Sequence, residues 1–300
     1  MKTKNILSAL ALAVSITLPA QAETIKHVQG EIEIDAVPQK VIGYSLAALD
    51  ALDALGVTVS GIPGGVLPPY LTRYETNGAE RLGTLFEPDY EAIAAMEPDL
   101  IIAGDRSAAK YADLAKIAPT IDLTIDRTDY LNSVRANVET LGKIFDKENE
   151  AAAQIAELDA ALAALREKAG KAGDALVIIT TGGRMSAHGV GSRFDVLYSG
   201  YGFTAAADNL DTANHGQAIS NEFLLETNPD WLFVVDRDAA IGREGASAAQ
   251  MLDNELVHQT TAWKNKQIVY LDATNWYLVG GGITAVKANI KQISDALSKN

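Results

Sequence analysis

One sequence pattern occurs twice in this chain, and it constrains the fold more than any other feature. The first copy, YEAIAAMEPDLIIAGDR, spans residues 90–106, and the second, NEFLLETNPDWLFVVDR, spans residues 221–237. Both have Glu at the second position, Pro-Asp in the middle and Asp-Arg at the end. Each copy predicts a helix that ends at Pro-Asp and is followed by a buried strand. The repeat therefore predicts two lobes of related architecture.

Segments expected as strands alternate with segments expected as helices around both copies. Such alternation is typical of a parallel sheet covered by helices. Between the two halves, KENEAAAQIAELDAALAALREKAGKAG has its apolar residues spaced for one face of a long helix. At about 1.5 Å per residue this helix would span roughly 35–40 Å, enough to cross between lobes. An ordinary surface helix within one domain is the alternative.

We therefore expect an α/β fold in which two lobes, each with a central, mostly parallel sheet, are joined by one long helix. The chain has 300 residues, of which 48% are hydrophobic, so it can bury cores of this size. The expected boundaries are 1–22 for a signal peptide, 23–145 for the N-terminal lobe, 146–172 for the connecting helix and 173–300 for the C-terminal lobe.

The N-terminal sequence indicates export. Lys2 and Lys4 precede an apolar run that ends at Leu18, and Ala20-Gln21-Ala22 follows, as in a signal peptide cleaved after Ala22. The run is shorter than the roughly 20 residues of a bilayer span, which favours export over a membrane anchor. The sequence contains no Cys for disulfides, thiolate metal ligands or lipid attachment. We therefore expect a soluble protein, free in a periplasm and not inserted in the membrane.

The net charge of −14 argues against broad binding to nucleic acids or anionic membranes, because these partners select for basic surfaces. An anionic ligand would need a local group of arginines. Arg106 and Arg237 end the two repeats, just past the expected carboxyl ends of strands, where open parallel sheets place ligand-contacting residues. Either arginine could equally be a surface charge. Glu91 and Glu222 begin the two helices, where the helix dipole alone would favour a carboxylate.

The sequence lacks the common signatures of enzymes. It contains no Gly-x-Ser-x-Gly, no Gly-x-x-x-x-Gly-Lys and no His-Glu-x-x-His, and its four His form no dense cluster. We therefore expect no catalytic residues and no enzyme activity, and a secreted hydrolase is the less favoured alternative.

The two repeats, with the Ala-rich connector between them, resemble the cobalamin and siderophore family of periplasmic binding proteins that feed ABC transporters. The resemblance covers essentially the whole mature chain. The segments GSRFDVLYSGYGF, NHGQAISNEF, VVDRDAAIG and VYLDATNWYLVGGG resemble the catecholate branch, the CeuE-like and VctP-like proteins. This resemblance implies a class III periplasmic binding protein fold, with a ferric siderophore in a shallow cleft and little closing motion. We also expect a monomer without an intrinsic cofactor.

The resemblance further implies roles for individual residues. Arg193, in the GSRF segment, would join Arg106 and Arg237 as a ligand-binding residue. Guanidinium groups suit a ferric tris-catecholate, which carries a triple negative charge, because they remain charged and donate several hydrogen bonds to oxygens. His215 and Tyr277 match residues that complete the iron shell when a siderophore supplies only two catechols. Imidazole and phenolate are both credible ligands of ferric iron.

Glu91 and Glu222 match the glutamates that dock into arginine pockets of the membrane permease. Together, these features predict a periplasmic protein that captures ferric catecholate siderophores and delivers them to an inner-membrane ABC transporter. One alternative keeps the scaffold but binds haem, cobalamin or a hydroxamate siderophore. A neutral ligand ranks lower, because it would leave three converging arginines without a counter-charge.

Overall fold

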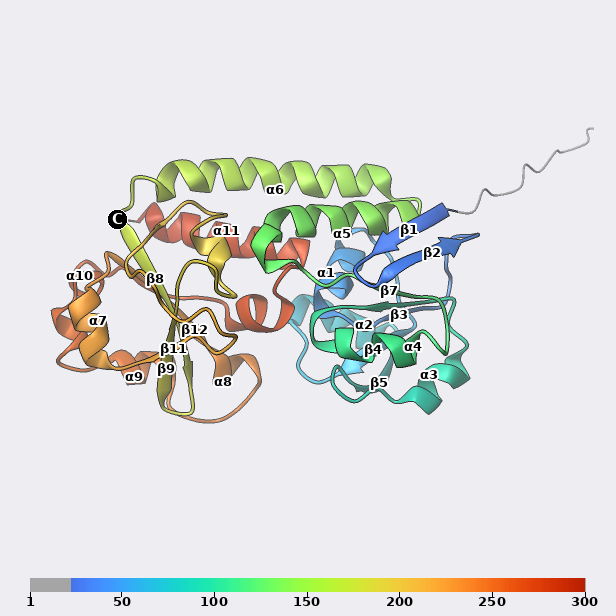
Figure 1. Ribbon diagram of the computed structural model, residues 1–300, viewed down its shortest axis with the longest axis horizontal. Helices are drawn as coiled ribbons and strands as arrows, with labels where there is room; N and C mark the ends of the chain where they lie inside the picture. Colours follow the sequence, from blue (N-terminus) through green and yellow to red (C-terminus); the bar gives the residue numbers. More distant parts are fainter. Residues whose placement is uncertain (1–22, 300) are drawn as a thin grey trace, which may run out of the picture.

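Two α/β lobes lie side by side and share a long helix along one edge of the molecule (Figure 1). The computed structural model describes residues 23–299. The expected signal peptide, residues 1–22, lies outside the described residues. Among the helices within 23–299, none combines the length and apolar character needed to cross a lipid bilayer.

The N-terminal lobe is built on a five-stranded sheet of order β5-β4-β3-β6-β7, in which all neighbouring strands are parallel. Its strands are β3 (Val41–Gly43), β4 (Gly61–Gly64), β5 (Glu80–Thr84), β6 (Leu100–Ala103) and β7 (Thr120–Asp122). Its helices are α1 (Leu46–Ala54), α2 (Arg73–Thr76), α3 (Tyr90–Met96), α4 (Tyr111–Leu114) and α5 (Tyr130–Ile144). An antiparallel hairpin of β1 (Glu23–His27) and β2 (Gly30–Ile34) precedes the sheet.

The C-terminal lobe has a six-stranded sheet of order β11-β9-β8-β12-β13, with β10 also paired to β8. Its strands are β8 (Asp174–Thr181), β9 (Arg184–His188), β10 (Thr204–Ala205), β11 (Gln217–Ile219), β12 (Trp231–Asp236) and β13 (Ile268–Tyr270). Its helices are α7 (Asn221–Thr227), α8 (Arg237–Ala240), α9 (Ala248–Leu252), α10 (Thr261–Lys264) and α11 (Ile283–Leu297). These two sheets confirm the expected α/β class.

One part of the C-terminal sheet is antiparallel. Strand β9 runs antiparallel to β8 and to β11, whereas β8, β10, β12 and β13 pair in parallel. Thr181 and Arg184 face each other across a two-residue turn, and both turn residues, Gly182 and Gly183, have positive φ. Glycine adopts this conformation without steric cost, which allows a tight hairpin. The sheet is therefore mostly parallel, as expected, with a hairpin added at one side.

The repeated sequence pattern has the same structural role in each lobe. Helices α3 and α7 begin after side-chain caps and end at left-handed residues, Glu97 and Asn228. The Asp of each Pro-Asp pair then accepts backbone hydrogen bonds from the chain that enters the neighbouring strand. Asp99 accepts from the N–H groups of residues 39 and 40 before β3, and Asp230 from that of Asp174 in β8. In each lobe the repeat therefore attaches its own helix and strand to the neighbouring strand of the sheet. The pair α3 and β6 is attached to β3, and the pair α7 and β12 is attached to β8.

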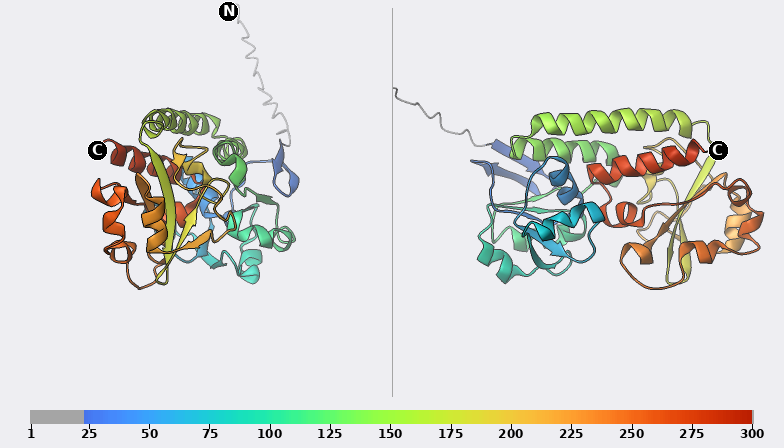
Figure 2. Two further views of the ribbon diagram at one scale, coloured as in Figure 1. Left: turned by 60° about the vertical axis from the view of Figure 1, so that its left-hand side comes forward. Right: turned by 180° about the vertical axis from the view of Figure 1, so that it is seen from behind.

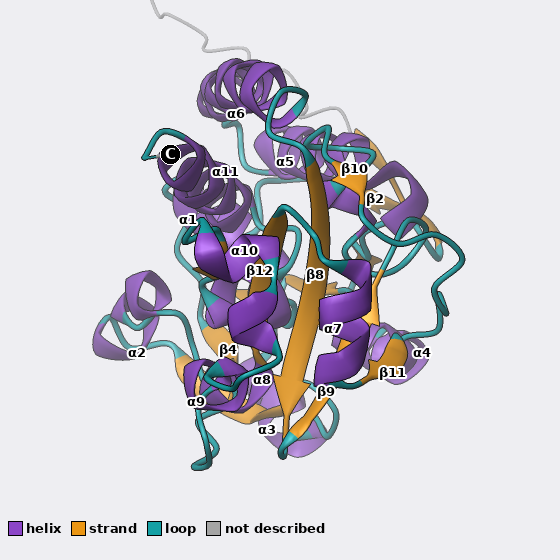
Figure 3. Cartoon of the chain, turned by 90° about the vertical axis from the view of Figure 1, so that its left-hand side faces the viewer, coloured by secondary structure: helices purple, strands orange, loops and turns teal. Residues whose placement is uncertain are grey.

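Helix α6 (Glu148–Ala169) connects the lobes and, at 22 residues, is about 33 Å long. Its bounds lie within the expected segment 146–172. Figure 2 shows it running along both lobes, and Figure 3 shows α5, α6 and α11 grouped on one side of the molecule. Its buried face joins one continuous hydrophobic cluster that includes side chains of both lobes, among them Leu49, Val134, Leu158, Val177 and Phe233. The lobes are therefore packed against each other.

A buried carboxylate ties the C-terminal helix to the N-terminal lobe. Asp50, in α1, accepts hydrogen bonds from the backbone N–H groups of Thr284 and Ala285 at 2.7 and 3.0 Å, and from the Tyr70 hydroxyl at 2.6 Å. A Cβ at Gly282 would collide with this carboxyl group, so the close approach requires glycine. Burial raises the pKa of Asp50 to about 6, although these hydrogen bonds favour its ionised form.

We expect Asp50→Ala to reduce the free energy of unfolding by about 2–4 kcal/mol, because it leaves two N–H groups and a hydroxyl without their acceptor. Urea denaturation of the purified variant measures this change. Asp113→Ala is the control, since Asp113 is an exposed residue of α4 that pairs with Lys116. If Asp50→Ala unfolds at the same urea concentration as the control, the Asp50 carboxylate does not stabilise the fold in this way.

Candidate functional site

A cavity of about 680 Å³ lies between the two lobes. Several of its lining segments follow the carboxyl ends of parallel strands: Ser45 follows β3, Arg106 follows β6, and 124–127 follow β7. The C-terminal half contributes Arg193, Phe194, Val196, Asn214, 276–281 and Asn289. Open parallel sheets place ligand sites at this edge of the strands.

Three guanidinium groups surround the ring of Tyr277. The Cζ atoms of Arg106, Arg193 and Arg237 lie 5.3, 4.7 and 5.4 Å from the ring centroid, within the range of cation–π contacts. Arg237 also donates a hydrogen bond of 2.7 Å from Nε to the Tyr277 hydroxyl. The three arginines that the sequence and the resemblance singled out therefore converge on one side chain, and we call this group the arginine cage.

Arg106 reaches the cage from the N-terminal lobe. Its guanidinium donates to the carbonyl oxygens of Leu278 at 2.8 Å and Tyr277 at 2.6 Å. The accepting residues belong to a π-helical segment, Thr274–Val279, a rare conformation that is frequent at functional sites. Tyr130 of α5 donates to the carbonyl oxygen of Gly280 at 2.8 Å. The N-terminal lobe thus holds the backbone that carries Tyr277.

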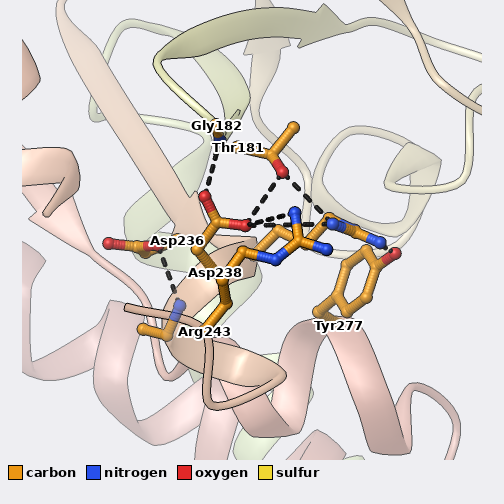
Figure 4. Close-up of polar contacts among 8 residues, drawn as sticks. Thr181, Gly182, Asp236, Asp238, Arg243 and Tyr277 are labelled. Atoms are coloured by element: carbon orange, nitrogen blue, oxygen red, sulfur yellow. Dashed lines mark hydrogen bonds and ion pairs between the residues drawn. The ribbon is translucent and has the colours of Figure 1, made fainter. Parts of the chain in front are cut away.

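Arg237 is the first residue of α8 and is positioned by the end of β8. Figure 4 shows Thr181 and Gly182, at this end of β8, close to Asp238. Its Nη1 donates to the Thr181 hydroxyl at 3.2 Å, and Thr181 donates to the carboxylate of Asp238 at 3.1 Å. A hydrogen bond from the Gly182 N–H, more than the nearby Arg243 and Arg237, lowers the pKa of Asp238 below its usual range. An ionised carboxylate therefore stays close to the Arg237 guanidinium, at 3.9 Å.

The positive charge of the cage changes the acid–base properties of its members. Burial alone would raise the pKa of Tyr277, but the hydrogen bond from Arg237 and the three nearby guanidinium charges lower the pKa below its usual value. Burial lowers the pKa of Arg193 to about 10, which leaves it charged at neutral pH. The cage therefore favours a bound phenolate or another oxygen anion.

His215 is an exposed residue at the rim of the site and is not among the residues that line the cavity. Its neighbour Asn214 does line the cavity. Burial, and then the nearby charges of Arg193 and His215, lower the pKa of His188 to about 4. The buried His188 ring contacts Phe194, which lines the cavity, so His215 lies near this part of the cavity wall. The structure thus brings Tyr277 and the arginines together and leaves His215 outside the cage.

Residues 23–299 contain no group of three or more His, Cys, Asp and Glu side chains placed to hold a metal ion. Among the side chains with oxygen or nitrogen donors, Tyr277, Asp105 and Asp126 line the cavity, whereas His215 does not.

Glu91 and Glu222 do not line the cavity, and one lies on each lobe. Both are exposed and occupy the first turns of α3 and α7, after the capping residues Asp89 and Ser220. Their equivalent placement follows from the repeated pattern. Two carboxylates are thus presented at matching positions of the two lobes.

Sequence reasoning missed two prominent residues of the cavity. Arg127 lines it from the loop after β7, a position equivalent to that of Arg106 after β6, and this placement was the available signal. Phe86 also lines it and is 60% exposed, so an apolar ring faces the open cleft. Such a ring can stack against an aromatic group of a ligand.

Nearly the whole chain is similar to known proteins. A family model described as "Periplasmic binding protein" matches residues 41–274. The petrobactin-binding protein YclQ of Bacillus subtilis is 38% identical over 281 residues, which covers 92% of this chain and 88% of YclQ. The crystal structure of YclQ matches with a TM-score of 0.89 over 93% of this chain and 100% of that chain.

Two Vibrio proteins are also similar. The ferric-anguibactin-binding protein FatB of Vibrio anguillarum is 33% identical over 275 residues, covering 90% of this chain and 85% of FatB. The crystal structure of the periplasmic catecholate-siderophore binding protein VctP of Vibrio cholerae is 33% identical, with a TM-score of 0.85 over 93% of this chain and 100% of that chain. The similarity therefore extends across both lobes.

The lowered pKa of Tyr277 gives a direct test of the cage. We expect one tyrosine to ionise at a lower pH than free tyrosine, and this step to disappear in Tyr277→Phe. In Arg237→Gln the step should move to higher pH, since both a hydrogen bond to the phenolate and a positive charge are lost. The ultraviolet absorbance of tyrosinate, followed against pH, reports each step.

Tyr74→Phe is the control for this titration. Burial raises the pKa of Tyr74, so its removal should leave the early step in place. An early step that persists in Tyr277→Phe would show that another tyrosine produces it.

Proposed function

The chain belongs to the periplasmic binding protein family, and on this premise we propose that it captures a ferric catecholate siderophore and delivers it to an inner-membrane ABC transporter. The names of its relatives support the substrate class, because they bind petrobactin, ferric anguibactin and catecholate siderophores. The protein would act as a monomer in the periplasm and catalyse no reaction.

The arginine cage is the observation that carries this proposal. Catecholates are dianionic oxygen donors, so a complex of ferric iron with three catecholates has a charge of minus three. With an effective dielectric constant of about 20, each pair of opposite unit charges at about 5 Å contributes roughly 3 kcal/mol. Three guanidinium groups at such distances outweigh the general repulsion by an acidic protein, which salt screens beyond about 8–10 Å.

Tyr277 supports the same substrate class. Its phenol oxygen accepts the hydrogen bond of Arg237, and its ring lies among three cations. A catecholate oxygen has the same geometry and more negative charge, so it can accept the same hydrogen bonds more strongly. With a siderophore that supplies only two catechols, the Tyr277 phenolate would itself ligate the ferric iron, and His215 would complete the shell.

The positive charge of the arginine cage also favours some of the competing ligands over others. A cobalamin or a neutral hydroxamate complex would bury part of the cage without supplying a counter-charge, which costs free energy. Haem carries carboxylates but not the clustered oxygen donors that match three guanidinium groups. Phe86, an exposed residue that lines the cavity, offers a surface for a catechol ring.

We expect ferric tris-catecholate and bis-catecholate complexes to quench the intrinsic fluorescence of the purified mature protein at low concentration. Ferric hydroxamate, haem and cobalamin should quench it far less. Arg193→Gln should weaken catecholate binding by about tenfold to a hundredfold, because a hydrogen bond to a charged group contributes about 1.5–3 kcal/mol. Tight binding of haem or cobalamin instead of the catecholates would contradict the proposed ligand and leave the family assignment intact.

Glu91 and Glu222 provide the proposed contacts with the permease. We expect Glu91→Ala combined with Glu222→Ala to abolish siderophore-dependent iron uptake by cells, while the purified variant binds its ligand as tightly as the wild type. Both carboxylates are exposed and neither lines the cavity, which is why affinity should not change.

Glu226→Ala is the matched control, since Glu226 is an exposed residue near the end of α7. It should support uptake at the wild-type level. Normal uptake by the double variant, or a loss of ligand affinity in the purified double variant, would rule out docking as the role of these two residues.

A further inference from the structure

Arg127 is a fourth arginine of the cleft, and its environment differs from that of the arginine cage. Its Nη1 donates a hydrogen bond of 3.3 Å to the side-chain oxygen of Asn214, which belongs to the other lobe. Both residues line the cavity and both are exposed. Within residues 23–299, no carboxylate forms an ion pair with Arg127. Its charge is therefore held at the cleft by a neutral amide.

The backbone of Arg127 is fixed although its side chain is exposed. The carboxylate of Asp126 accepts hydrogen bonds from the N–H and the hydroxyl of Thr128 at 2.8 and 2.7 Å. The N–H of Asp126 is bonded to the hydroxyl oxygen of Ser133 in α5 at 3.1 Å. Because the backbone of Arg127 is fixed and its side chain is long, the guanidinium can exchange one partner in the cleft for another at little cost in free energy.

The partner of Arg127 belongs to the loop that carries His215. Gly216, the next residue, has positive φ, and a Cβ there would collide with the carbonyl oxygen of Ala187 and the ring of His188. The loop is thus pressed onto β9 at Gly216 and tied across the cleft at Asn214. His215 lies between these two attachments. The Arg127–Asn214 hydrogen bond therefore helps to set where His215 can lie relative to the cavity.

We propose that Arg127 discriminates between ferric complexes by their charge and exchanges Asn214 for the ligand. This inference rests on the proposed function. A complex with three catecholates, of charge minus three, draws Arg127 from Asn214 into a charge-assisted hydrogen bond with a catecholate oxygen. A complex with two catecholates, of charge minus one, leaves Arg127 on Asn214. The loop then stays at the cleft, where His215 can reach an unfilled position on iron.

Two substitutions should have opposite consequences for the two complexes. We expect Arg127→Gln to weaken binding of the ferric tris-catecholate by about tenfold or more, since it removes a charged hydrogen-bond donor. Its effect on a ferric bis-catecholate should be smaller. Asn214→Ala should bind the tris-catecholate at least as tightly as the wild type, because a competing acceptor is gone. It should bind the bis-catecholate more weakly, because the His215 loop loses its tie.

Arg135→Gln is the matched control, because it removes the same charge from α5 and Arg135 pairs with Asp159 outside this cavity. The four proteins would be titrated with both complexes at several salt concentrations, since loss of a ligand-contacting cation should also reduce the salt dependence of affinity. Thermal unfolding of each variant would verify that it is folded.

The outcomes separate this inference from the proposed function. If the wild type binds neither complex, the proposed function fails. If the wild type and Arg135→Gln bind both complexes but Arg127→Gln binds the tris-catecholate equally well, Arg127 has no such role. If Asn214→Ala weakens binding of the tris-catecholate as much as Arg127→Gln does, the proposed exchange is also wrong. Asn214 would then support the ligand instead of competing with it.

Discussion

The site depends on holding three like charges around one phenol ring. Guanidinium groups at this spacing repel one another, and burial of Arg193 adds a desolvation cost that its lowered pKa reflects. Fixed acceptors offset this repulsion: two carbonyl oxygens for Arg106, Thr181 and the Tyr277 hydroxyl for Arg237. The aromatic face of Tyr277 supplies further attraction to all three. The cage is therefore a preorganised anion site, with its positive charge already assembled.

The connection between the lobes keeps this cage assembled. The chain from Tyr277 to Ala285 follows the C-terminal sheet, yet Arg106, Tyr130 and Asp50 of the N-terminal lobe hold its backbone. Helix α6 and one continuous hydrophobic core also cross between the lobes. Any large opening would break these contacts together. On the proposed function, we therefore expect binding to depend on exchange of side-chain partners more than on closure of the lobes, and preorganisation limits the entropy lost on binding.

The sequence predicted those features that follow from local patterns. The repeated segments placed Arg106 and Arg237 past the ends of strands and Glu91 and Glu222 on helix starts, because strand order and helix caps are encoded locally. The placement of Arg193 and Tyr277 in the cleft followed from the resemblance. Contacts between distant loops carry no local pattern, so Arg127, Phe86 and the antiparallel strand β9 were not foreseen. The exposed position of His215 outside the cage has the same cause.

The most direct test of this account is a crystal structure of the mature protein with a ferric tris-catecholate, with iron located by its anomalous scattering. The account predicts iron in the cavity between the lobes, with catecholate oxygens within hydrogen-bond distance of Arg106, Arg193 and Arg237. Tyr277 should have released the hydrogen bond that it accepts from Arg237 in the present structure. Iron bound elsewhere, or a Tyr277 ring still surrounded by all three guanidinium groups with no ligand oxygen among them, would contradict it.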